Sequence, residues 1–438
     1  MKALLNKALQ VCDSAEVYCR EIFSTSTSIR LGTMQNIESE KKTEISLRVV
    51  KDGNMGSAVA TSLEDETILE RALLSLAHQK SEPIIFPNEM MNEVFCFSKE
   101  VQELTTDELV NIAFGVSDRL KAAAPDVATG VDVTKIVKTV KMINSSDFAN
   151  VYDYTNIALG MFTINDQGFF SESKEYSSSM IPEVMDKHID KLIQLHRLSE
   201  KPVTLENERI PVIFTGNVMG ALMLRVVGGV NGGNIIKDIS PLKDKLGEQV
   251  FSDKISIRDD GSMPFGCNSC CFDDEGTRAR NTLIFENGVL KNYLLSIGQA
   301  KKLDMMPTGN AIKRTLFSKE IEDAPAVFDT NLVIEGDSVP DDSIIKSIKR
   351  GLLITGVMGA HTGNINQGEF SLNISSGYLI EDGELVGKVK GSMIAGNIYD
   401  LFQKVEAIGS EYEVMRSIFY NMGYSPMVLF REANIIGK

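Results

Sequence analysis

The side chains best suited to chemistry lie mostly in the second half of the chain, and a cysteine cluster is the most conspicuous. Cys267 and Cys270 form a C-x-x-C pair, and Cys271 follows directly. A structural zinc site usually needs two such pairs, or one pair with two histidines, and the other cysteines lie at unsuitable spacings. A thioredoxin-like redox pair should open a helix after a strand, whereas this pair runs into a turn. We therefore expect ordinary buried or half-buried thiols.

The four histidines predict no metal site. His78 is expected at a helix end. His188 and His196 lie too far apart on one predicted helix to share a metal. His361 lies in a glycine-rich loop, where it could act as a general base, but the sequence assigns it no serine or cysteine partner. We expect it to be a solvated or carbonyl-bonded loop histidine.

Two further clusters were considered as binding sites. The carboxylates of residues 273–275 could bind a metal, but adjacent acids before Gly276 are more often a solvated turn, which is what we expect. The glycine-rich residues 228–233 lack the Lys-Ser/Thr of a P-loop and the spacing of a dinucleotide-binding loop. They also follow a helix, and the C-terminal end of a helix disfavours anions.

The segment from residue 356 to residue 368 is the best candidate for substrate binding. Residues 369–374 after it alternate between apolar and polar, as a strand with one buried face does. Glycines tolerate backbone angles that other residues avoid, and loops on rigid strands commonly bind ligands. We expect a mobile loop whose substrate contacts come from Gly356, Gly359, His361, Gly363 and Asn366.

The elements that must position these residues indicate an α+β fold with two domains. A chain of 438 residues is too long for one ordinary core. The first half alternates between helices and groups of strands, which predicts an N-terminal sheet with flanking helices over residues 1–200. A polar linker follows, and short strands separated by glycine turns predict a β-rich domain over residues 205–438.

Local patterns predict individual elements. Thr105 and Glu108 have the spacing of a capping box, and Asp52-Gly53 favours a hairpin turn. The polar residues 24–28 are expected to separate two short strands, at residues 15–23 and 28–32. In the second half, we expect helices over residues 216–227, 297–303, 342–350 and 397–408.

Charge and hydropathy argue against two classes of partner. The net charge is −15, and no Lys/Arg-rich run is present to neutralise phosphates, so we expect no direct binding to nucleic acid. No stretch reaches the roughly 18 apolar residues of a membrane span, and the N-terminus reads as an amphipathic helix and not as a signal peptide. We therefore expect a cytoplasmic protein without a membrane partner.

Four segments of the second half resemble the C-terminal signature of the TldD/PmbA family. Members of this family were once described as modulators of DNA gyrase, and it is related to a metalloprotease. The segments occur in the family's order and at its approximate spacing, strongly over residues 205–410 and more weakly before that. They are residues 240–250, 272–276 with 286–290, 307–310 and 351–397. The resemblance implies a PmbA/TldD-like fold.

The resemblance also implies where a zinc site would lie. In the TldD branch, the helix after the first strand of the C-terminal domain carries His-Glu-x-x-x-His, with two zinc ligands and a general base. On this chain that motif falls on Leu224, Arg225 and Gly229, which cannot do this chemistry. The family's third ligand, a C-terminal cysteine, is missing too, since no cysteine follows Cys271. The pattern resembles the PmbA branch, also called TldE, which keeps the fold and loses the metal site.

That branch pairs with a TldD-type metalloprotease subunit. The resemblance therefore implies a non-catalytic subunit of a complex that cleaves unfolded peptides or small proteins, in peptide maturation or degradation. It implies zinc in the partner and none in this chain, no catalytic residue here, and a homodimer or heterodimer. Two alternatives stay open: a stand-alone hydrolase that uses Cys270 or Cys271 with His361, and a regulatory or binding protein without a proteolytic complex.

Overall fold

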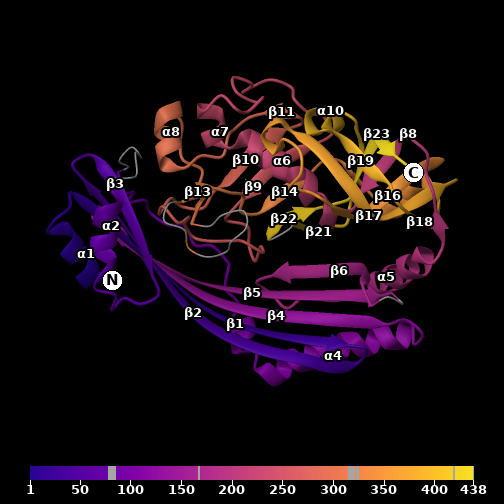
Figure 1. Ribbon diagram of the computed structural model, residues 1–438, viewed down its shortest axis with the longest axis horizontal. Coiled ribbons are helices and arrows are strands. Elements are labelled where there is room, and N and C mark those ends of the chain that lie inside the picture. Colours follow the sequence, from indigo (N-terminus) through magenta and orange to yellow (C-terminus); the bar gives the residue numbers. More distant parts are fainter. Residues whose placement is uncertain (77–84, 166–167, 314–320, 322–324, 418–419, 438) are drawn as a thin grey trace.

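The chain forms one long N-terminal sheet with a β-rich C-terminal part lying against one of its faces (Figure 1). The computed structural model describes residues 1–76, 85–165, 168–313, 321, 325–417 and 420–437. The α+β prediction of an N-terminal sheet with flanking helices and a β-rich C-terminal domain is confirmed. The domain boundary near residues 200–205 stays a prediction, and His78 lies outside the described residues.

The N-terminal sheet is antiparallel, in the order β3-β2-β1-β4-β5-β6. Its strands run beneath the C-terminal part, and helix α4 lies along the face that points away from it (Figure 1). The predicted turn at Asp52-Gly53 joins β2 to β3, and both residues have the positive φ that such a turn requires. The strands are β1 (Ser14–Arg30), β2 (Thr33–Lys51), β3 (Asn54–Ala60), β4 (Thr129–Asn144), β5 (Ala149–Ile164) and β6 (Phe170–Ser178).

Strand β1 is continuous, so the predicted break at residues 24–28 was wrong. Thr25 and Thr27 are buried at 3% and 2% exposed, and their hydroxyls find partners on β2. The Thr25 hydroxyl lies 3.2 Å from that of Ser39, and the Thr27 hydroxyl donates to the sulfur of Met34 at 3.3 Å. Threonine favours extended backbone, so a polar run with satisfied hydroxyls continues the strand.

Two groups of helices cover the outer face of the N-terminal sheet. Apolar residues of α1 and α2 pack near the start of β1, and those of α3, α4 and α5 pack on its other half. The predicted capping box is confirmed, because the Glu108 amide donates to Thr105 Oγ1 and the Thr105 amide donates to Glu108 Oε2. The helices are α1 (Lys2–Leu9), α2 (Ile68–Ser75), α3 (Lys99–Glu103), α4 (Thr106–Ala123) and α5 (Asp186–Ser199).

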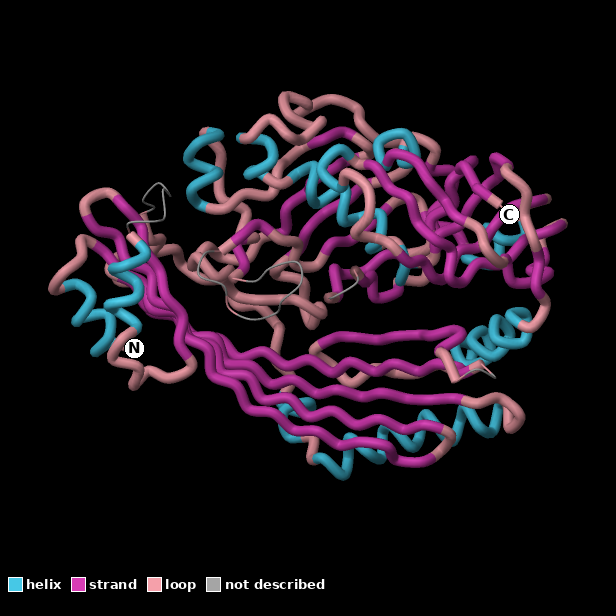
Figure 2. Tube along the Cα trace, in the orientation of Figure 1, coloured by secondary structure: helices cyan, strands magenta, loops and turns pink. Residues whose placement is uncertain are grey.

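The C-terminal part has two main sheets, and strands dominate it (Figure 2). One sheet follows the order β15-β20-β23-β8-β16-β17-β18-β7, with β19 pairing with β17 and β23. Its strands are β7 (Pro202–Val203), β8 (Glu208–Phe214), β15 (Ser338–Val339), β16 (Arg350–Met358), β17 (Glu369–Glu381), β18 (Glu384–Val389), β19 (Met393–Asn397), β20 (Val405–Gly409) and β23 (Val428–Ile436). The other follows β11-β10-β9-β14-β22-β21, made of β9 (Ser256–Asp260), β10 (Asn281–Glu286), β11 (Val289–Leu290), β14 (Leu332–Glu335), β21 (Glu413–Arg416) and β22 (Asn421–Ser425). A short pair joins β12 (Ala311–Ile312) to β13 (Ala326–Val327).

Helix α6 (Gly220–Val230) lies in the core that both sheets share. Apolar residues occupy every side of this helix, as expected for a helix that is buried all round. The other helical segments are η1 (Gly216–Val218), α7 (Gly232–Ile236), α8 (Ile297–Leu303), α9 (Asp341–Lys346), η2 (Ile365–Gln367) and α10 (Ile398–Phe402). Among the described residues, no helix is both long and apolar enough to cross a membrane.

Three predicted helices in this part differ from the structure. The helix at residues 216–227 begins as η1 and continues through the Gly228-Gly229 pair to Val230. The helix at 342–350 ends at Lys346, because Arg350 already begins β16. The helix at 397–408 is only the short α10, because β20 follows and pairs with β23. Sheet pairing overrides the helical periodicity there. The helix at 297–303 is confirmed.

Candidate functional site

Helix α6 and the glycine-rich loop, which the sequence presents as separate features, lie against each other. The loop follows β16. The helix follows β8, and the short helix η1 lies between β8 and α6 in the sequence. These two strands are parallel neighbours, with Leu352 opposite Val212 and Ile354 opposite Phe214. Their C-terminal ends therefore meet at one edge of the sheet, where ligand sites often form. The geometry brings both groups of predicted site residues into one place.

Arg225 of α6 holds this loop through its backbone. Its Nη1 donates to the carbonyl of Ala360 at 2.6 Å, and its Nη2 donates to that of Thr362 at 2.7 Å. Its Nε donates to the carbonyl of Glu369 at 2.9 Å, where the loop enters β17. Nη1 also bonds the carbonyl of Ala221 in the same helix, at 2.7 Å. A single planar guanidinium therefore fixes both arms of the loop to the helix.

The positive charge of Arg225 has no acidic partner among the described residues. The residue is 0% exposed, and the acceptors described around it are carbonyl oxygens. Burial without a carboxylate lowers the pKa of Arg225 to about 10. The guanidinium remains charged at neutral pH, and the carbonyl dipoles are what stabilise it.

The loop itself covers residues 359–364 and continues into η2. Gly356, predicted to belong to it, lies instead inside β16, where the register with β17 shifts. Gly359 and Gly363 have φ values of 87° and 83°, which L side chains rarely adopt. The side chain of His361 is exposed, so the buried contacts of this loop come from its backbone.

Asn366 of η2 and the glycine pair of α6 complete this arrangement. Asn234 Nδ2 donates to Asn366 Oδ1 at 3.1 Å and to the carbonyl of Gly228 at 2.8 Å. A Cβ at Gly228 would lie 3.3 Å from Asn366 Oδ1. The absence of a side chain at Gly228 thus lets η2 approach the helix closely. Asn366 therefore lies against Gly228 of α6 and accepts a hydrogen bond from Asn234 of α7 (Gly232–Ile236), and no described contact gives it another role.

The residues at the implied metal position do not fit zinc. Leu224 and Gly229 have no donor atoms, and Arg225 carries a positive charge. A Cβ at Gly229 would lie 2.3 Å from the hydroxyl oxygen of Tyr399, so that ring already fills the space of a larger side chain. Across the described stretches of the chain, no three or more His, Cys, Asp and Glu side chains are arranged to hold a metal ion.

The cysteines and histidines occupy other places. Cys267 and Cys270 are buried and Cys271 is half-buried, which confirms the prediction for these thiols. Cys270 packs in a cluster with residues of the N-terminal sheet, whereas His361 lies in the loop held by Arg225. No contact between described residues joins His361 to either cysteine. The structure therefore gives no support to a cysteine hydrolase built from these groups.

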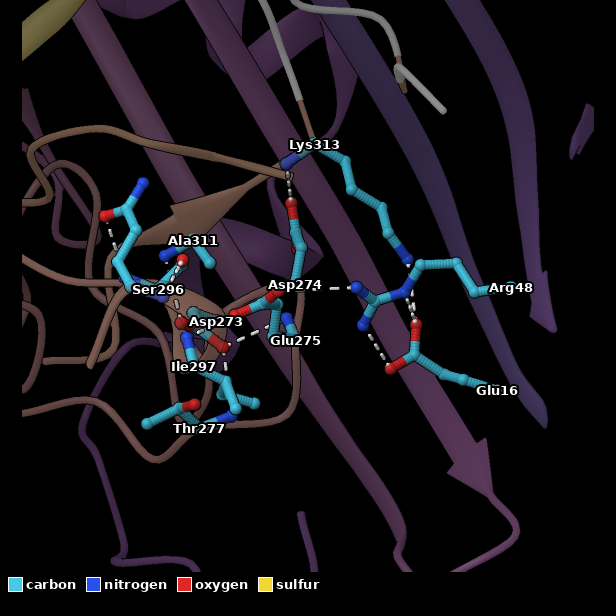
Figure 3. A network of polar contacts seen from close by, with 11 residues as sticks. Glu16, Arg48, Asp273, Asp274, Glu275, Thr277, Ser296, Ile297, Ala311 and Lys313 are labelled. Carbon is cyan, nitrogen blue, oxygen red and sulfur yellow. Dashed lines mark hydrogen bonds and ion pairs between the residues drawn. The ribbon is translucent and has the colours of Figure 1, made fainter. Parts of the chain in front are cut away.

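The carboxylates of residues 273–275 were predicted to be a solvated turn, and this prediction was wrong. They are 1%, 6% and 5% exposed and lie at the junction between the two parts of the chain (Figure 3). Asp273 accepts hydrogen bonds from the amides of Glu275, Thr277 and Ala311 at 2.9–3.0 Å. Burial and the nearby Glu275 raise the pKa of Asp273 well above its usual value. The segments that bury this turn are distant in the sequence, and the residues of the turn carry no local pattern that predicts the burial.

An ion-pair network continues from this turn into the N-terminal sheet (Figure 3). Arg48 of β2 bonds both carboxylate oxygens of Glu16 in β1, at 2.9 and 2.7 Å, and lies 3.4 Å from Glu275. Lys313 Nζ lies 3.1 Å from Glu16 Oε1. Glu275 also accepts the amide of Ile297 at the start of α8. The network joins the N-terminal sheet to the C-terminal part. Its charged groups bond to one another and to backbone amides of the described residues, so they do not form a set of free metal ligands.

Comparisons with known proteins identify the family. A model of the PmbA/TldA metallopeptidase C-terminal domain matches residues 207–437, and a model of domain 1 matches residues 15–78. Metalloprotease PmbA of Escherichia coli is 26% identical over 432 residues, covering 93% of this chain and 89% of the relative. An uncharacterised Methanocaldococcus jannaschii protein is 28% identical over 362 residues, covering 82% and 83%. The crystal structure of TldE from Thermococcus kodakarensis has the same fold, with a TM-score of 0.89 over the full length of both chains at 22% identity. Since the C-terminal model alone covers more than half of the chain, this protein belongs to the PmbA/TldD metallopeptidase family.

Proposed function

We propose that this chain is a non-catalytic subunit of a TldD/PmbA-type metalloprotease complex that cleaves unfolded peptides or small proteins. The observation that carries the proposal is the substitution at the motif helix. The family resemblance gives the position of the general base to Arg225, and this residue uses its guanidinium to hold a loop. The resemblance gives the position of the second histidine to Gly229, where the hydroxyl of Tyr399 fills the space that a side chain would need. This chain then shapes the site, while zinc and the general base belong to a TldD-type partner.

The role proposed for this chain is peptide binding through the loop at residues 359–364. Its outward face carries the exposed His361 and Gly363, while its inner face is tied to α6. An extended peptide can bond to the backbone of such a loop or of an adjacent strand. The six free cysteines suit a reducing compartment, and we place the complex in the cytoplasm.

Co-expression with a TldD-type homologue from the same organism tests the pairing. We expect the two chains to co-purify and to cleave an unfolded peptide together, with one zinc bound per TldD-type subunit. A control complex, in which the partner's motif glutamate is changed to glutamine, should assemble but not cleave. Full cleavage by this chain alone would contradict the assignment, as would cleavage by the control complex.

The regulatory or binding alternative predicts a different result. If this chain binds peptide but never associates with a TldD-type subunit at micromolar concentration, the non-catalytic subunit proposal is wrong. Size-exclusion chromatography of the mixed chains, with each chain alone as reference, separates these outcomes.

A further inference from the structure

A groove open to solvent lies where helix α5 meets α4 and strand β18. Its volume is about 450 Å³, which is in the size range of sites for small ligands. Figure 1 shows α5 beside β18, at the junction between the two parts of the chain. None of the residues that line the groove belongs to α6 or to the loop at residues 359–364. They are Ala123, Asp190, Ile193, Gln194, Arg197, Leu198, Lys201 and Leu385.

One face of α5 supplies most of this groove. Asp190, Gln194 and Arg197 are separated by four and three residues, so they follow one another along the same side of the helix. The rise of an α-helix places roughly 10 Å between the levels of Asp190 and Arg197. Lys201 follows the end of the helix. The groove therefore has a negative group near one end, an amide in the middle and two positive groups at the other end.

These charged groups are available to a ligand. Asp190 and Lys201 are exposed, and their side chains form no ion pair with another described residue. Arg197 lies 3.6 Å from Asp126, but the two side chains are 58% and 73% exposed. Such an exposed pair contributes little free energy, so the carboxylate of a ligand can replace Asp126 beside Arg197.

Hydrogen bonds hold the C-terminal end of α5 in place and occupy several of its carbonyls. The Tyr378 hydroxyl donates to the carbonyl of Leu195 at 2.8 Å, and the Lys201 amide donates to that of Leu198 at 3.0 Å. The Lys201 carbonyl accepts the amide of Lys388 in β18 at 2.8 Å. An anion at this end of the groove therefore meets two cations, and it is not opposed by bare carbonyls at these positions.

We propose that this groove binds a short peptide of two or three residues with free termini. An extended chain advances about 3.3–3.6 Å per residue, so three residues match the separation between Asp190 and Arg197. The terminal ammonium group bonds to the Asp190 carboxylate. The terminal carboxylate bonds to the Arg197 guanidinium and to the Lys201 ammonium group, as such charged pairs commonly do.

The middle of the groove suits the middle of such a peptide. Leu385 of β18 lines it together with Ile193 and Leu198 of α5, so an apolar side chain of the ligand has a surface to pack against. The amide of Gln194 can both donate to and accept from a peptide bond. Peptide cleavage releases short peptides with free termini, so the groove would bind a product. That last link rests on the proposed function, whereas the binding itself does not.

Isothermal titration calorimetry of the full-length chain, without a partner subunit, tests the proposal with the tripeptide Ala-Leu-Ala as the probe. We expect binding at millimolar concentration. The N-acetylated and the C-amidated tripeptides should each bind about tenfold more weakly, because each lacks one charged contact. Asp190→Asn should weaken binding of the free tripeptide but not of the N-acetylated one. Arg197→Met should weaken binding of the free tripeptide but not of the C-amidated one.

Lys301→Met is the matched control. Lys301 is also a cation in the last turn of a helix, but this helix is α8, and the residue does not line the groove. Binding should be unchanged in this variant. Equal affinities for the free and the blocked tripeptides would overturn the proposal, as would the absence of binding or binding that survives both Asp190→Asn and Arg197→Met. A failure to pair with a TldD-type subunit would contradict the proposed function and would leave these binding results intact.

Discussion

Arg48 and Arg225 are buried to similar extents, at 1% and 0% exposed, yet their charges are stabilised in opposite ways. Arg48 lies between the carboxylates of Glu16 and Glu275 and joins the N-terminal sheet to the C-terminal part. Arg225 contacts backbone carbonyls and fixes a loop within its own domain. The pKa of Arg48 is raised by Glu16 and Glu275 despite its burial, whereas that of Arg225 is lowered by burial.

The comparison shows that a buried arginine can stabilise the whole fold in one region and fix the conformation of a single loop in another. Removing one member of a buried ion pair leaves the other charge without compensation, which is costly. Removing a buried charge that has no counter-ion also removes its desolvation penalty, which offsets part of the lost hydrogen bonding. We therefore expect changes at Arg48 to weaken the whole fold, and changes at Arg225 to act mainly on the loop.

Arg48→Met should have the largest effect. It leaves Glu16 with Lys313 alone, and we expect it to lower the free energy of unfolding by about 3–5 kcal/mol. Urea unfolding followed by circular dichroism measures this loss. Arg350→Met is the matched control, because Arg350 also bonds two glutamates but its side chain is 45% exposed. That control should cost less than about 1 kcal/mol. Equal losses in the two variants would remove the distinction between buried and exposed pairs.

Arg225→Met should have a smaller global effect, about 1–3 kcal/mol, because lost carbonyl bonds are partly offset by the removed buried charge. Its local effect should be larger. Amide hydrogen exchange should accelerate across residues 359–369 and stay unchanged in the N-terminal sheet. Arg225→Lys keeps the charge but cannot bond three separated carbonyls, so it should also loosen the loop. If the loop in Arg225→Lys exchanges as slowly as in the unmodified protein, charge and not geometry holds it.

Gly229→Ala tests the packing at the position that the family resemblance gives to a zinc ligand. The new Cβ collides with the Tyr399 hydroxyl, and we expect a loss of about 1–2 kcal/mol despite the better helix propensity of alanine. Gly115→Ala in α4 is the control, because Gly115 is also inside a helix and nothing lies within 4 Å of the Cβ that the substitution would add, so we expect no loss of stability.

Tyr399→Phe should rescue Gly229→Ala in thermal unfolding. The hydroxyl it removes is buried and, among the described residues, has no hydrogen-bond partner, so its loss costs little. A double variant as unstable as Gly229→Ala would show that the collision lies elsewhere.

His361→Ala should have the smallest effect, within about 0.5 kcal/mol of the unmodified protein, because its side chain is exposed. We expect normal pairing with a TldD-type subunit and only a modest reduction in peptide cleavage. Gly359→Val should reduce cleavage more, because a β-branched residue resists a φ of 87°. If His361→Ala abolishes cleavage while pairing survives, this chain supplies a catalytic group and the proposed function is wrong.

Local signals in the sequence were sufficient for several elements. The capping box at Thr105 and the hairpin turn at Asp52-Gly53 depend on residues within four positions of one another, and both are confirmed. The strand at residues 369–374 is confirmed for the same reason. The hydroxyls of Thr25 and Thr27 were misread, because their partners lie on a second strand.

Long-range contacts explain what sequence reasoning missed at the candidate site. The turn at residues 273–275 is buried by partners as distant as Arg48 and Ala311. Arg225 appeared only as a residue that cannot act as a base, because its three loop acceptors are backbone carbonyls that carry no side-chain signal. The parallel pairing of β8 and β16 was the missing information, and it could not be read from either segment alone.

The carbonyl ring around Arg225 also bears on how such a subunit could evolve. A glutamate in place of Arg225 would point a carboxylate at four carbonyl oxygens, which repel it, and would release the loop at the same time. A histidine in place of Gly229 would require Tyr399 to move first. Each single step back toward a metal site is therefore harmful by itself. Under the proposed function, a division of labour between two subunits would be preserved because each of these substitutions costs stability before any metal site is formed.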